Sequence, residues 1–150
     1  MADPMTSGLN SERYYQKVAK TMGIDNNGMD DFLRLFRISG MAHCGVGGIS
    51  GAGAWMFGQS GAAAAAPNNI VGNLMDWVEN GDAPNTLLGN KFWYDTASLG
   101  IEFERPHCKY PFRTTYEGGD STKSESWGCT YIDDWQACEG ITCDADGTFT

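Results

Sequence analysis

The stretch Asp30–Cys44, DDFLRLFRISGMAHC, decides how the fold of this chain is interpreted. Its apolar run from Phe32 to Ile38 lies between aspartates and a Ser-Gly pair, which is typical of a short buried strand. Arg34 and Arg37 are three residues apart and allow a helix as the alternative, but the short length favours the strand. His43 then follows the end of a strand, where open α/β sheets build their functional sites.

The residues before this stretch predict a helix over Ser11–Gly23. Apolar side chains recur there at helical spacing, and Gly23 can adopt the left-handed turn that ends many helices. Either Asn10 or Ser11 can cap its first turn.

The residues after His43 fall into three segments. Gly45–Pro67 is dominated by glycine and alanine and predicts a long loop. Asn68–Gly81 returns to helical spacing, with an asparagine cap and a closing glycine, and its apolar face is expected to pack on a sheet. Ala83–Tyr94 is expected to be extended.

The overall composition limits the possible functions. A chain of 150 residues is one ordinary domain or part of a larger one, and its net charge of −9 argues against nucleic acid and anionic membrane surfaces as partners. No apolar run approaches the roughly 20 residues that span a bilayer.

The cysteines favour an oxidising, secreted setting, although the opening MADPMTSGLN has no signal-peptide pattern. A small secreted binding module stapled by disulfides is therefore one functional class to consider. The five cysteines are Cys44, Cys108, Cys129, Cys138 and Cys143.

Hydrolysis by a serine nucleophile needs a histidine base and a carboxylate that orients it. His43 is the candidate base, although a lone histidine in a turn can equally be a surface or capping residue, and Asp3 is the candidate carboxylate. Ser50 lies in GISGA, which lacks the last glycine of the G-x-S-x-G elbow, and it follows His43 in the chain. The sequence therefore offers an acid and a base without a serine elbow.

Other candidate sites have simpler explanations. The dipeptides His43-Cys44 and His107-Cys108 do not have zinc-ligand spacing, and DADG at 144–147 lacks the later ligands of a calcium loop. We therefore expect no metal site, and His107 is expected at the surface. Five aromatic residues can line a pocket for an aromatic acyl group, or fill the core: Trp55, Phe57, Phe92, Trp93 and Tyr94.

Five segments together resemble the C-terminal part of the tannase and feruloyl esterase family, in order, over most of residues 1–130. They are MADPMTSGLNSERYYQKV, DDFLRLFRISGMAHC, NLMDWVENGDAPNTLLG, RPHCKYPF and YEGGDSTKSESWGC.

The resemblance implies an α/β fold: residues 1–130 form the C-terminal segment of an α/β-hydrolase catalytic domain, without its nucleophile half and its lid domain, and residues 131–150 form a cysteine-containing tail. The family carries a calcium ion in the lid, so no cofactor is expected in this chain. The implied activity is hydrolysis of phenolic acid esters, feruloyl first and galloyl second, including esters linked to plant cell-wall polysaccharide. This chain is expected to be an inactive fragment of such a secreted enzyme.

The resemblance also implies roles for single residues. Asp3 matches the family's triad aspartate and His43 its triad histidine, 40 residues further on. In the family, the cysteine that matches Cys44 forms a disulfide with the cysteine just before the catalytic serine. That second cysteine and the serine are both expected upstream of residue 1.

Two further disulfides are expected. Cys108 and Cys129 match cysteines that form a late disulfide in the family, and Cys138 and Cys143 are expected to close a small loop in the tail. Spacing alone leaves three pairings open for these four cysteines.

Overall fold

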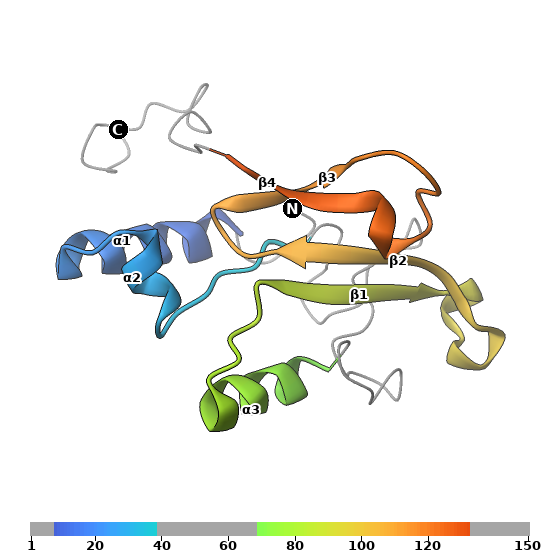
Figure 1. Ribbon diagram of the computed structural model, residues 1–150, viewed down its shortest axis with the longest axis horizontal. Helices are drawn as coiled ribbons and strands as arrows, with labels where there is room; N and C mark the ends of the chain where they lie inside the picture. The colour runs from blue at the N-terminus through green and yellow to red at the C-terminus, as the bar shows by residue number, and fades with distance from the viewer. Residues whose placement is uncertain (1–7, 39–68, 133–150) are drawn as a thin grey trace.

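The computed structural model of the protein describes residues 8–38 and 69–132 (Figure 1). Three helices precede the strands in the chain, and three short 3-10 turns lie between or beside the strands. In order, the elements are α1 (Leu9–Met22), α2 (Asn26–Asp30), α3 (Ile70–Asn80), β1 (Thr86–Phe92), η1 (Trp93–Asp95), η2 (Ala97–Leu99), β2 (Ile101–Cys108), β3 (Phe112–Tyr116), η3 (Ser124–Ser126) and β4 (Trp127–Tyr131).

The described strands form two antiparallel pairs, β1 with β2 and β3 with β4. β1 confirms the extended segment expected over 83–94, except that residues 93–95 form the turn η1. The two hairpins lie side by side, with β2 facing the β3–β4 pair (Figure 1). The amide of Glu104 on β2 donates to the carbonyl of Thr122, 2.9 Å away, which links them directly.

Both long helices confirm the sequence-based prediction, and their ends show why. α1 ends at Gly23, which has the left-handed φ of 67°, and α3 ends at Gly81 with φ 79°. The side chain of Asn69 accepts hydrogen bonds from the first amides of α3. The cap expected for α1 is wrong, because the helix already begins at Leu9 and Gly8 stands at its N-cap position without a side-chain bond.

The expectation that α3 packs on a sheet is not met within the described residues. No residue of α3 is buried, and the apolar side chains at Ile70, Leu74 and Val78 are 44%, 55% and 77% exposed. None of the described helices is long and apolar enough to cross a membrane.

The strand expected over Phe32–Ile38 is also wrong as a regular strand. α2 ends at Asp30, and only Phe36 pairs with another segment, through a single antiparallel bridge to Lys109. Pro111 follows Lys109 by two residues on the segment that faces Phe36. It has no amide hydrogen, so it cannot extend the ladder in that direction. The apolar run is only partly buried, with Phe32 50% exposed, and it forms one bridge rather than a ladder.

The buried core lies where α1, α2 and the end of β2 meet. Tyr15, Met29 and Tyr110 form its centre, and the rings of Tyr15 and Tyr110 meet edge to face with centroids 5.3 Å apart. Partly buried apolar side chains surround them: Val18, Ala19, Ile24, Leu33 and Leu35. The segment that precedes His43 in the chain thus contributes directly to this core.

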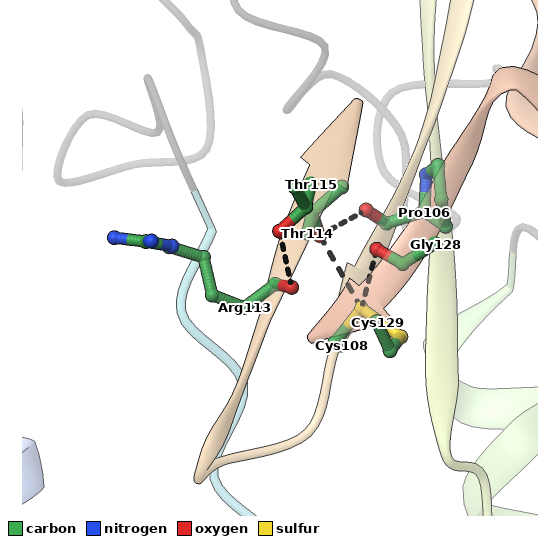
Figure 2. Close-up of a disulfide and its surroundings, with 7 residues drawn as sticks. All are labelled: Pro106, Cys108, Arg113, Thr114, Thr115, Gly128 and Cys129. Atoms are coloured by element: carbon green, nitrogen blue, oxygen red, sulfur yellow. Dashed lines mark hydrogen bonds between the residues drawn. A yellow bond between two sulfur atoms is a disulfide. The ribbon is translucent and has the colours of Figure 1, made fainter. Parts of the chain in front are cut away.

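A disulfide joins Cys108 at the end of β2 to Cys129 on β4, the pairing that the family resemblance implied (Figure 2). Next to it, the hydroxyl of Thr114 on β3 donates to the carbonyl of Pro106, 2.6 Å away (Figure 2). The two hairpins are therefore linked both covalently and by a hydrogen bond.

Removing this disulfide should destabilise the protein. The bond closes a loop with a sequence separation of 21. We expect the double variant Cys108→Ser/Cys129→Ser to lose about 3 kcal/mol of unfolding free energy, because the open loop gains entropy in the unfolded chain. Urea denaturation of both proteins checks this. Reductant should destabilise the parent more than the double variant, and an equal response would contradict the prediction.

Tyr15 should make stability fall at high pH. Burial, and then the negative charge of Asp30, raise the pKa of Tyr15 to about 12. The unfolded chain releases this proton near the ordinary pKa of about 10, so unfolding becomes easier as the pH rises from there toward the folded value. Within the described residues the Tyr15 hydroxyl has no hydrogen-bond partner, so Tyr15→Phe should fold. Its unfolding free energy should decline less between pH 10 and about 12 than that of the parent. Tyr14→Phe, which alters a 65% exposed neighbour, should decline as the parent does.

Candidate functional site

The two residues matched to catalytic roles, Asp3 and His43, lie outside the described part of the chain. The same holds for Cys44, which is matched to a disulfide, and for Ser50, Cys138 and Cys143. The structure does describe the segments next to them. α1 begins six residues after Asp3, and Ile38 lies five residues before His43.

Arg34 fixes the segment before His43 to the connection between α3 and β1. Its terminal nitrogen donates to the carbonyl oxygens of Ala83 and Pro84, at 2.8 and 2.7 Å, and to the side chain of Asn85 at 3.2 Å. Its guanidinium also lies 5.3 Å from the ring centre of Trp77 on α3. A planar, always charged group suits such a set of acceptors beside an aromatic face.

Asp30 at the end of α2 lies between two cations. Its carboxylate pairs with the ammonium of Lys109, and Arg34 Nε lies 3.9 Å from the other carboxylate oxygen. Arg34 Nε also donates to the Asp30 carbonyl at 3.2 Å. All three side chains are mostly withdrawn from solvent, with exposed fractions of 12 to 17%. Pairing in such a place is screened less than at the surface.

The end of β2 holds the same segment through its backbone. We call Cys108, Lys109 and Tyr110 the β2 clasp. The amide of Tyr110 donates to the carbonyl of Leu35 at 2.7 Å, and Lys109 forms the bridge to Phe36 and donates to the carbonyl of Asn85 at 3.0 Å. Because Cys108 is bonded to Cys129, the clasp is also tied to β4.

His107 corrects an expectation, because it is 2% exposed rather than at the surface. It pairs with Leu87 across the β1–β2 ladder, and Leu87 is itself buried. The aromatic pocket is not assembled by the described residues either. Phe92 is buried while Tyr94 is 85% exposed, and Trp55 and Phe57 lie outside the described ranges.

Arg105 on β2 forms a contact that the sequence did not suggest. Its guanidinium lies 3.5 Å from the ring centre of Trp127 on β4 and 5.5 Å from that of Phe103, and burial lowers its pKa. Phe103 and Arg105 are two apart on one strand, so they share a face of the sheet. This stacking supports the contact between the hairpins.

The described residues do not assemble a catalytic or metal centre by themselves. Within residues 8–38 and 69–132, no three histidine, cysteine, aspartate or glutamate side chains gather as metal ligands. A shallow hollow of about 330 Å³ lies between α1 and residues 33–35, and its described lining includes no histidine or carboxylate. What the described part of the chain does show is how the segments next to Asp3 and His43 are held in the fold.

The anchoring roles of Arg34 and Arg37 were missed from the sequence. The signal was present, because a charged residue within an apolar run needs a partner once the run is buried. Their partners are on other elements: Arg34 contacts residues 83–85, while Arg37 contacts Glu12 and Tyr110. No local pattern identifies partners so distant in the chain.

Comparison with known proteins gives consistent similarities. Residues 1–130 match the family described as tannase and feruloyl esterase. A probable feruloyl esterase B-1 of Aspergillus flavus is 40% identical over 131 residues, which cover 86% of this chain and 24% of that protein. The chain thus spans about a quarter of the length of the curated relatives it matches.

Two solved structures resemble the chain in fold and sequence. An esterase from Aspergillus oryzae superposes with a TM-score of 0.76 at 39% identity, over 85% of this chain and 25% of that one. Feruloyl esterase B from the same organism gives a TM-score of 0.73 at 36% identity, with the same coverage.

Removing the charge of Asp30 should loosen the segment before His43. We expect Asp30→Asn to lower the unfolding free energy by about 2 kcal/mol, since it weakens charge-assisted bonds and leaves Lys109 without its carboxylate. Asp31→Asn is the matched control, because Asp31 is the exposed next residue, and should stay within about 0.5 kcal/mol of the parent. Equal urea midpoints for the two variants would refute the role given to Asp30.

Proposed function

Because the chain belongs to the tannase and feruloyl esterase family, a family of carboxylic ester hydrolases, we propose that it carries two members of a serine esterase triad. Asp3 is the acid and His43 is the base. The motif match supports this assignment, since MADP and GMAHC stand in the family's order within the residues that match the family. That match over residues 1–130 is the single observation on which the proposal depends.

The proposed chemistry is acyl transfer to a serine. The serine oxygen bonds to the ester carbonyl carbon while His43 takes the hydroxyl proton, and His43 then returns this proton to the departing alcohol. Water, activated by His43 in the same way, releases the acid and regenerates the serine. Asp3 holds the His43 imidazole in one tautomer and stabilises its charged form.

The serine itself is proposed to come from outside these 150 residues. No G-x-S-x-G pattern occurs in the sequence, and Ser50 in GISGA does not meet it. Cys44, next to His43, is proposed to bond to a cysteine beside that serine. Such a bond would tie the base and the nucleophile together covalently.

The proposed substrates are esters of phenolic acids: feruloyl esters first, in keeping with the names of the relatives, and galloyl esters second, in keeping with the tannases of the family. We further propose that the chain is the C-terminal segment of an α/β-hydrolase domain of a secreted enzyme, and that a calcium ion belongs to a lid not contained in it. The 150-residue chain alone should be inactive, because a triad without its nucleophile cannot form the acyl intermediate.

A chimera tests this proposal. Residues 1–130 of this chain would replace the matching quarter of Aspergillus oryzae feruloyl esterase B, and hydrolysis of methyl ferulate would be measured. We expect an active chimera whose kcat/KM falls at least about a thousandfold with His43→Ala or Asp3→Asn. The 150-residue chain alone should show no turnover above background.

Ser50→Ala is the control and should keep the activity of the parent chimera. Full activity of His43→Ala, or loss of activity in Ser50→Ala, would contradict the assigned roles. Turnover by the chain alone would contradict the proposal that the serine lies elsewhere.

A further inference from the structure

One ion pair connects the two segments that carry the proposed triad residues. Arg37 lies six residues before His43, and Glu12 on α1 lies nine residues after Asp3. A terminal guanidinium nitrogen of Arg37 is 3.6 Å from the Glu12 carboxylate. The contact therefore spans from the histidine-bearing segment to the helix that follows the aspartate.

The Glu12 side of the pair is largely withdrawn from water. The side chain of Glu12 is 11% exposed and that of Arg37 is 29% exposed. A carboxylate withdrawn from water is costly unless a cation or hydrogen-bond donors compensate it. Glu12 thus favours conformations in which Arg37 stays beside it, and these fix the register of the two segments.

Tyr110 of the β2 clasp also contacts Arg37. The Arg37 guanidinium lies 5.1 Å from the Tyr110 ring centre, within the range of a cation–π interaction. From α1, the amide of Gln16 donates to the Tyr110 hydroxyl at 3.1 Å, and the backbone amide of Tyr110 donates to Leu35 at 2.7 Å. α1, the β2 clasp and the segment before His43 therefore converge on Tyr110 and Arg37.

We propose that Arg37 and Glu12 are positioning residues that set the segment of His43 against the segment of Asp3. The inference rests on the proposed function. Proton transfer in a triad needs hydrogen bonds of about 2.6–3.2 Å, whereas a slip of one residue along an extended segment moves it by about 3.3 Å. Arg37 forms this ion pair within two residues of Ile38, where the described part of the segment ends, so the pair holds the described residues that lie nearest to His43 on that side. Without the Arg37–Glu12 pair, the positions of the base and of its orienting acid relative to each other are less well fixed.

The test uses the same chimera with Aspergillus oryzae feruloyl esterase B, assayed well below the lowest melting temperature of the set. Arg37→Met and Glu12→Gln should each lower kcat about tenfold to a hundredfold. A misplacement of catalytic groups by up to about 1 Å has effects of this order. KM should stay near that of the parent, since neither residue is proposed to contact substrate. The double variant should be no slower than the slower single variant.

Two further variants separate positioning from general stability. Arg37→Lys keeps the charge beside Glu12 and should recover much of the lost kcat. Arg113→Met removes an exposed arginine from β3 and should leave kcat unchanged. If Arg37→Met folds poorly, Glu12→Gln and Arg37→Lys still give the comparison of kcat with KM.

The outcomes distinguish this inference from the proposed function. Loss of activity in His43→Ala together with unchanged kcat in Arg37→Met and Glu12→Gln would overturn the positioning role alone. A double variant whose loss is the product of the two single losses would also overturn it, because independent sites behave in that way. Full activity of His43→Ala would overturn the proposed function and this inference with it.

Discussion

The described structure depends on the contacts between the β2 clasp and the segment before His43. Within three consecutive residues it combines a disulfide to β4, an ion pair to Asp30 and a backbone bond from Tyr110 to Leu35. Each contact restricts the chain in a different way. The disulfide lowers the entropy of the unfolded chain, the ion pair holds two charged side chains together, and the backbone bond sets the register of the two segments. Because all three involve neighbouring residues, loss of one weakens the geometry that the others need.

The helices could be predicted from sequence because their signals are local. Asn69 and Gly81 mark both ends of α3, and the structure uses them as the pattern indicated. The strand over Phe32–Ile38 could not be judged in this way. Its apolar pattern indicated a buried strand, whereas the segment is only partly buried and pairs at Phe36 alone, with Lys109, which lies far away in the chain. Burial of His107 likewise depends on its pairing with Leu87.

The candidate site shows the same difference between local signals and contacts that are distant in the chain. Asp3 and His43 were identified because short motifs around them resemble those of a family, and a motif needs no knowledge of the fold. The supporting contacts of Arg37 with Glu12 and Tyr110 join residues that are 25 and 73 positions apart. The apolar neighbours of Arg37 indicate that its charge needs a partner, but nothing in the local sequence identifies Glu12 or Tyr110 as that partner. Supports of this kind become visible only once the chain is folded.

The contacts of Arg34 have a consequence for how this sequence can vary. One guanidinium serves two carbonyl oxygens, an amide oxygen, the Asp30 backbone and the face of Trp77. A lysine there would keep the charge but present a compact ammonium that lacks the planar fork. A substitution at position 34 therefore has to keep a planar donor as well as a charge, whereas residues 83 and 84 offer backbone carbonyls that any side chain there would leave in place.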